Sequence, residues 1–77
     1  MSIPVLHFEL GEHKNWKYSH CKIKEWYGAS LCRRVTIDDP KVKRSVVTKK
    51  NMPTCPECLK LMETAQRGPT KFEIGEE

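Results

Sequence analysis

Apolar and polar residues alternate along three stretches of the first half of the chain. In VLHFEL, Leu6, Phe8 and Leu10 fall on one face of an extended segment, as a half-buried strand requires. WKYSHCKI and SLCRRVTI alternate in the same way, and the turn-forming stretches GEHKN and EWYG separate the three. The pattern therefore predicts strands near residues 5–10, 16–23 and 30–37.

Two further segments follow the turn signal DDP. The stretch KVKRSVVT is β-branched and basic, which predicts a fourth strand near residues 41–48. At the other end, residues 69–77 form a short acidic tail. This tail either adds a strand through Phe72 and Ile74 or frays.

The spacing of apolar residues becomes helical after residue 54. One face of the expected helix carries Cys55, Cys58, Leu59, Met62 and Ala65. Thr54 and Glu57 have the spacing of a capping box with Thr54 as the N-cap, and Pro56 suits the first turn. Gly68-Pro69 ends the pattern.

These elements predict one small α+β domain over residues 1–77, an antiparallel β-ribbon or sheet followed by one C-terminal helix. Residues 1–13 are expected to form an extra N-terminal strand and residues 69–77 a tail that is ordered only if it pairs. Only 38% of the residues are hydrophobic. A core of this size is marginal without a disulfide, a metal or a partner chain.

The apolar runs are too short to cross a membrane, and the N-terminus lacks the features of a secretion signal. We therefore expect a cytoplasmic protein. In a reducing compartment, the four cysteines are better suited to metal ligation or to remaining free thiols than to disulfides.

The pair Cys55-Pro-Glu-Cys58 at the helix start is half of a typical zinc site. A redox role would need a neighbouring βαβ pattern, which this chain does not show. Cys32 is the expected third ligand. The fourth is either His20 or Cys21, because adjacent strand residues face opposite ways. Two other histidines are weaker candidates, His13 as an outside possibility and His7 as a surface residue.

The layout of these residues resembles small zinc-finger proteins encoded by bacteriophages and prophages. The resemblance is carried by His20, Leu31-Cys32, Val47-Thr48 and Thr54-Cys55-Pro56-Glu57-Cys58. It implies one structural zinc ion on His20, Cys32, Cys55 and Cys58, with Cys21 as the alternative to His20. The implied fold is treble-clef-like or zinc-ribbon-like, with the metal tying the β-ribbon to the helix start. Two departures are Arg33, where a glycine often follows the cysteine, and the additional Cys21.

The sequence offers no catalytic constellation. Glu57 lies between two candidate ligands, but the capping box accounts for it. Zinc deaminases combine Pro-Cys-x-x-Cys with an upstream His-x-Glu, whereas this chain has Cys-Pro-x-Cys and no such His-x-Glu. We therefore expect a protein that is not an enzyme and has no small-molecule substrate.

The net charge of +4 is concentrated in residues 14–50, which hold eleven of the fourteen basic side chains. A basic middle favours an anionic partner, and aromatics among the cations favour nucleic acid. We expect Trp16 and Tyr18 to pack beside the metal. The expected partner surface consists of Trp26, Tyr27, Lys22, Lys24, Arg33, Arg34, Lys43 and Arg44.

Two functions fit this surface. The first is a phage-type regulator that binds nucleic acid. The alternative is a protein-interaction module that inhibits or diverts a host enzyme or a defence complex, with the Trp26-Tyr27 turn as its anchor.

Overall fold

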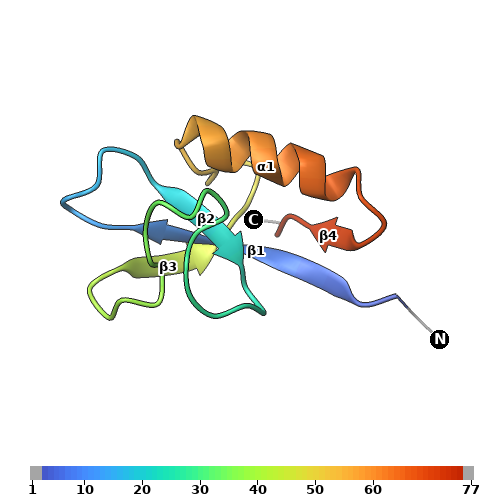
Figure 1. The fold of residues 1–77 in the computed structure, drawn as a ribbon, viewed down its shortest axis with the longest axis horizontal. Helices are drawn as coiled ribbons and strands as arrows, with labels where there is room; N and C mark the ends of the chain where they lie inside the picture. Colours follow the sequence, from blue (N-terminus) through green and yellow to red (C-terminus); the bar gives the residue numbers. More distant parts are fainter. Residues whose placement is uncertain (1–2, 76–77) are drawn as a thin grey trace.

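The structure, a computed structural model, describes residues 3–75 as a small α+β domain with one helix packed on a four-stranded sheet (Figure 1). The elements are β1 (Val5–Glu12), β2 (His20–Ile23), β3 (Lys43–Val46), α1 (Pro56–Gln66) and β4 (Lys71–Glu73). β1 lies between β2 and β3 and pairs antiparallel with both, while β4 pairs in parallel with the N-terminal part of β1. Within the described residues, no helix is long and apolar enough to cross a membrane.

The core lies between α1 and one face of the sheet. The alternation predicted for β1 is confirmed, because Phe8 and Leu10 are buried there beside their β2 neighbours Ile23 and Cys21. Met62 of α1 closes this core from above. The predicted helix therefore buries its cysteine and methionine face.

The other face of the sheet is covered by the long connection between β2 and β3. Ile37 of this connection is fully buried, and a Cβ atom placed on Gly11 of β1 would lie 3.0 Å from its side chain. Glycine at this strand position thus permits the close approach of the connection. Farther along, the ammonium of Lys22 bonds Asp38 across the same face.

The acidic tail adds a strand rather than fraying over the residues that the structure describes. Phe72 stacks on Phe8 with ring centroids 5.0 Å apart, and β4 pairs with Val5–His7. Gly75 then donates a backbone hydrogen bond to Val47. The last two residues of the expected tail lie outside the described range.

The strand predicted near residues 30–37 is wrong. This segment forms successive turns, with only an isolated bridge between Ala29 and Thr36. Ser30 accepts a backbone hydrogen bond from Arg33, which has a φ of 60°. The sequence alternates like a strand, but the turns carry Cys32 to the helix start instead.

Two boundaries also differ from the predictions. The strand expected from residue 16 begins only at His20, because the preceding residues form a loop. The predicted capping box is absent: Cys55 is the N-cap and makes no side-chain cap hydrogen bond. The Thr54 hydroxyl bonds Ser19, and the Glu57 carboxylate bonds Arg34.

Candidate metal centre

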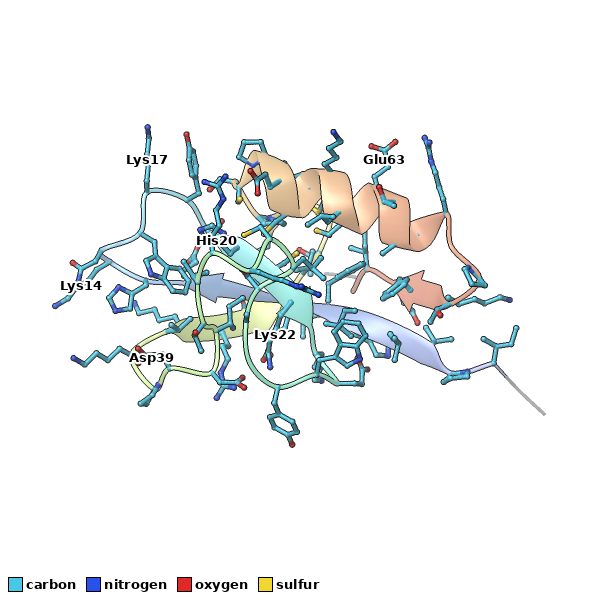
Figure 2. All side chains as sticks on the ribbon, viewed as in Figure 1. Lys14, Lys17, His20, Lys22, Asp39 and Glu63 are labelled. Atoms are coloured by element: carbon cyan, nitrogen blue, oxygen red, sulfur yellow. The ribbon has the colours of Figure 1, made fainter. Side chains whose placement is uncertain are left out.

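Four metal-binding side chains from three separate segments meet at the start of α1. His20 opens β2, Cys32 lies in the turns that follow it, and Cys55 and Cys58 begin the helix. Their donor atoms all lie within 4.8 Å of one another. Figure 2 shows sulfur atoms gathered beneath the start of α1, beside the labelled His20.

The spacing of these atoms fits a tetrahedral ion. Ligands about 2.1–2.3 Å from zinc lie about 3.5–3.8 Å from one another at the corners of a tetrahedron. The Nδ1 atom of His20 lies 3.3 Å from Cys32 Sγ and 3.7 Å from Cys58 Sγ. His20, Cys55 and Cys58 are buried, and Cys32 is half-buried. This cluster could therefore hold one metal ion.

Hydrogen bonds prepare two of the sulfurs for ligation. Those from the Cys21 thiol and the Cys21 backbone N–H lower the pKa of Cys58 to about 4, against the opposing effect of burial. Burial raises the pKa of Cys32, while a hydroxyl bond from Ser30, 3.1 Å away, and a backbone bond from Arg34 oppose it. Because metals bind thiolates, both sets of bonds favour ligation.

Cys21 lies outside the four-residue cluster. Its side chain is fully buried in the core with Leu10 and Ile23, on the sheet face beneath α1. Its hydrogen bond to the Cys58 sulfur, together with burial, raises the pKa of Cys21. A neutral Cys21 thiol is suited to donating to the Cys58 thiolate rather than to binding a metal beside it.

Two contacts outside the cluster hold the segments in place. The Ser19 backbone N–H bonds Thr54 Oγ1 at 2.8 Å, and the Thr54 N–H bonds Ser19 Oγ at 2.9 Å. This reciprocal pair joins the residue before His20 to the residue before Cys55. On the other side, Arg34 binds both carboxylate oxygens of Glu57 at 2.5 and 3.2 Å.

These outer partners were missed in the sequence, where Thr54 and Glu57 were assigned to a capping box. The ring of His20 is also supported from outside, by Trp16, which meets it edge-on with centroids 5.4 Å apart. Ser30 carries the one local signal that could have been used, a hydroxyl two residues before a ligand cysteine. The two outside candidates are not part of the cluster: His13 lies in the loop after β1, and His7 is a half-buried residue of β1.

The residues of the expected partner surface differ in how exposed they are and in whether they form ion pairs. Lys22 is a correction to that set, because it is only 3% exposed and bonds Asp38 and the Trp26 carbonyl. Two other members are exposed but engaged, Arg34 with Glu57 and Arg44 4.0 Å from Asp38. The remaining members are exposed, namely Lys24, Arg33, Lys43, Trp26 at 58% and Tyr27 at 95%.

The cluster predicts a three-thiolate spectrum for the cobalt-substituted protein. Cys21→Ser is expected to leave the thiolate-to-cobalt charge-transfer band unchanged, because the serine hydroxyl can still donate to Cys58. Cys32→Ser is expected to weaken the band by about one third, since one of three cobalt–sulfur bonds is lost. A weaker band in Cys21→Ser would instead make Cys21 a ligand.

Comparison with known proteins adds no family to this picture. The chain matches no protein-family model, and it has no significant match among curated proteins or solved structures. Its identification rests on its own residues: it is a small α+β domain with a His–Cys₃ cluster that could hold one metal ion.

Proposed function

We propose that this protein is a zinc-stabilised, non-enzymatic module that binds nucleic acid. The observation that carries the zinc assignment is the convergence of His20, Cys32, Cys55 and Cys58 within 4.8 Å. One imidazole and three thiolates form a typical closed zinc site, in which four protein ligands complete the tetrahedron. A catalytic zinc ion keeps a position open for water or substrate, so a full set of protein ligands favours a structural role.

The choice of nucleic acid rests on cations that the fold leaves available. Lys24 and Arg33 are exposed, and neither forms an ion pair among residues 3–75. Among the described residues, Lys14, Lys17 and Lys41 on the loops are likewise exposed and outside any ion pair. Such side chains can release counterions from a phosphate backbone, which supplies most of the free energy of nonspecific binding.

Fluorescence anisotropy of labelled oligonucleotides, titrated with zinc-loaded protein, tests this function. We expect binding at low salt whose affinity falls linearly on a log–log plot against salt, with a slope that reports several phosphate contacts. Absence of binding to DNA and to RNA at low salt would overturn the proposal.

A second candidate is a protein-interaction module, favoured by the exposed aromatic pair Trp26 and Tyr27. The Lys22 ammonium bonds the Trp26 carbonyl at 2.6 Å, and Asp38 accepts a hydrogen bond from the Gly28 N–H. These two bonds fix the backbone at Trp26 and immediately after Tyr27. Rigid aromatic anchors are typical of interface hot spots. This candidate predicts that the protein pulls a partner protein down from a cell lysate, that nuclease treatment leaves this complex intact, and that Trp26→Ala abolishes it. Loss of the complex on nuclease treatment would contradict this candidate.

A further inference from the structure

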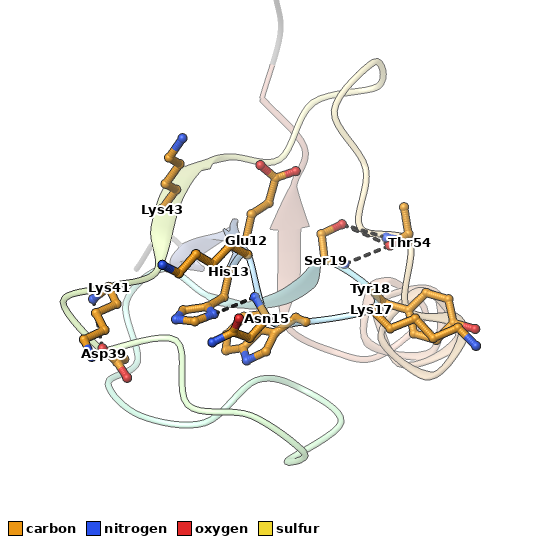
Figure 3. Close-up of a pocket in the computed structure, with 12 residues that line it drawn as sticks. Glu12, His13, Asn15, Lys17, Tyr18, Ser19, Asp39, Lys41, Lys43 and Thr54 are labelled. Atoms are coloured by element: carbon orange, nitrogen blue, oxygen red, sulfur yellow. Dashed lines mark hydrogen bonds between the residues drawn. The ribbon is translucent and has the colours of Figure 1, made fainter.

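A broad groove opens beside the metal centre, between two loops at one end of the sheet. Its walls are the loop after β1 and the loop before β3, and its volume is about 1130 Å³ (Figure 3). In Figure 2, Lys14 and Lys17 of the first loop and Asp39 of the second project from this end of the molecule. Twelve residues line the groove, and only Lys43 among them belongs to the partner surface expected from the sequence.

Positive charge predominates around the groove. Four exposed lysines, Lys14, Lys17, Lys41 and Lys43, line it together with two carboxylates, Glu12 and Asp39. In the described part of the chain, none of the four ammonium groups belongs to an ion pair. This differs from Lys22 and Arg34, which are held by carboxylates. The groove therefore gathers cations that an anionic ligand can neutralise.

Aromatic side chains lie among these cations. Tyr18 is 39% exposed, and the Lys17 ammonium lies 5.4 Å from the centre of its ring. The half-buried Trp16 lies between two histidine rings, His13 with its ring centroid 5.5 Å away and the candidate ligand His20. The expectation that Trp16 and Tyr18 only pack beside the metal is thus incomplete, because both also line the open groove.

We propose that this groove is the binding site for a single-stranded nucleic acid, an inference that rests on the proposed function. The lysines of the two walls contact successive phosphates, and an unpaired base stacks on the accessible ring of Tyr18. Cations along the backbone together with an aromatic platform are the shared features of sites that bind single strands. Both contacts, phosphate and base face, are common to DNA and RNA.

The rest of the surface is poorly suited to a duplex. A double helix is usually read by a helix or a β-ribbon that enters its major groove. The exposed face of α1 carries Glu57 and Glu63, each paired with an arginine, which leaves Lys60 as its one cation without an ion pair among residues 3–75. The bases of a duplex are stacked on one another, so their faces are not available to stack on Tyr18.

The groove is also joined to the metal centre. Trp16 contacts the ring of His20, and Ser19 at the end of the groove wall is bonded to Thr54 beside Cys55. A metal that fixes His20 and Cys55 would therefore also fix the wall that carries Tyr18. A metal ion bound to His20 and Cys55 would act on this site by positioning that wall.

Anisotropy titrations of zinc-loaded protein with dT and rU oligonucleotides and with a duplex of equal length test the site. The double variant Lys17→Glu/Lys41→Glu changes one lysine on each wall. We expect it to weaken single-strand binding at least tenfold and to lower the salt slope by about 1.4, for two lost phosphate contacts. The matched variant Lys60→Glu/Lys71→Glu makes the same change in net charge at two exposed lysines outside the groove, and we expect it to stay within about threefold of wild type.

A second pair of variants tests stacking. Tyr18→Ala is expected to weaken binding about fivefold or more, with little change in salt slope, while Tyr18→Phe, which keeps the aromatic ring, leaves affinity unchanged. Comparing the dT and rU titrations shows whether the ribose hydroxyl contributes. Circular dichroism and zinc content confirm that each variant is folded, and if Tyr18→Ala does not fold, the lysine variants still decide.

The outcomes separate this inference from the function on which it rests. Wild-type binding that is weakened equally by the groove pair and the control pair would overturn the groove and leave the nucleic-acid function intact. Tighter binding to the duplex would overturn the single-strand assignment. No binding by the wild type would overturn both.

Discussion

Stripping the metal from the zinc-loaded protein with a strong chelator is expected to abolish its folded structure. The far-UV circular dichroism of the sheet and helix should collapse, and the cooperative thermal transition should disappear. Structural zinc contributes on the order of 10 kcal/mol to small fingers at neutral pH. A domain of 77 residues has little else to replace it.

The reason lies in which segments the cluster joins. Cys32 lies in a segment of turns rather than in a strand. The start of β2 contacts the start of α1 chiefly through His20, Cys55 and the hydrogen bonds between Ser19 and Thr54. Without a metal, the Cys58 sulfur, whose pKa is lowered, would be a buried thiolate with no metal cation to balance its charge.

The measurement must show that the metal has left. Elemental analysis should give less than one tenth of the original zinc, and adding zinc back should restore the spectrum. Cys58→Ser should resemble the stripped protein, because it removes a fully buried candidate ligand whose sulfur contacts both His20 and Cys21. A metal-free protein with an unchanged spectrum and melting temperature would show that the cluster does not stabilise the fold.

The candidate site could be predicted from the sequence because its side chains are chemically distinctive. A Cys-x-x-Cys pair beside a helical pattern limits what the other half can be, and so few cysteines and histidines remain that Cys32 and His20 were among the few choices. What residue counting could not decide was His20 against Cys21. That depends on which of the two faces the core, and Cys21 pairs with Leu10 there.

The path of the chain around the site was harder to predict. SLCRRVTI alternates like a strand, yet tertiary contacts override the pattern, since Ile37 packs on Gly11 and Arg34 is held by Glu57. The groove was missed for a related reason. Its two walls are separated by the nineteen residues 20–38, and no local pattern shows that Tyr18 and Lys41 line one hollow.

Replacing Lys22 is expected to have the second-largest effect on stability. The Lys22 side chain is 3% exposed, and its ammonium bonds Asp38 at 2.9 Å and the Trp26 carbonyl at 2.6 Å. Lys22→Met keeps most of the aliphatic stem but removes this ammonium. Glu9 is a third partner at 3.6 Å. Removing one partner of a buried ion pair lowers the free energy of unfolding by about 3–5 kcal/mol. Because the Asp38 and Glu9 carboxylates are partly exposed, we expect Lys22→Met to lower it by roughly 2–3 kcal/mol.

Lys24→Met is the matched control. Lys24 is close to Lys22 in sequence, but its side chain is exposed and forms no ion pair among residues 3–75. Its replacement should therefore change the free energy of unfolding by less than about 0.5 kcal/mol. Urea unfolding of the two zinc-loaded variants measures the difference. Equal stabilities would mean that the Lys22 ammonium contributes nothing beyond its stem.

The pH dependence separates charge from packing. The Lys22 ammonium, helped by the Gly28 N–H, lowers the pKa of Asp38. A carboxyl with a lowered folded pKa stabilises the protein above its ordinary pKa, and this contribution is lost as the pH falls through the folded value. The difference between wild type and Lys22→Met should therefore be full at pH 7 and shrink below about pH 4. Hydrogen exchange at Gly28 should accelerate in the variant, because the carboxylate that accepts its N–H is no longer held in place. A pH-independent difference with unchanged Gly28 exchange would assign the effect to packing of the stem alone.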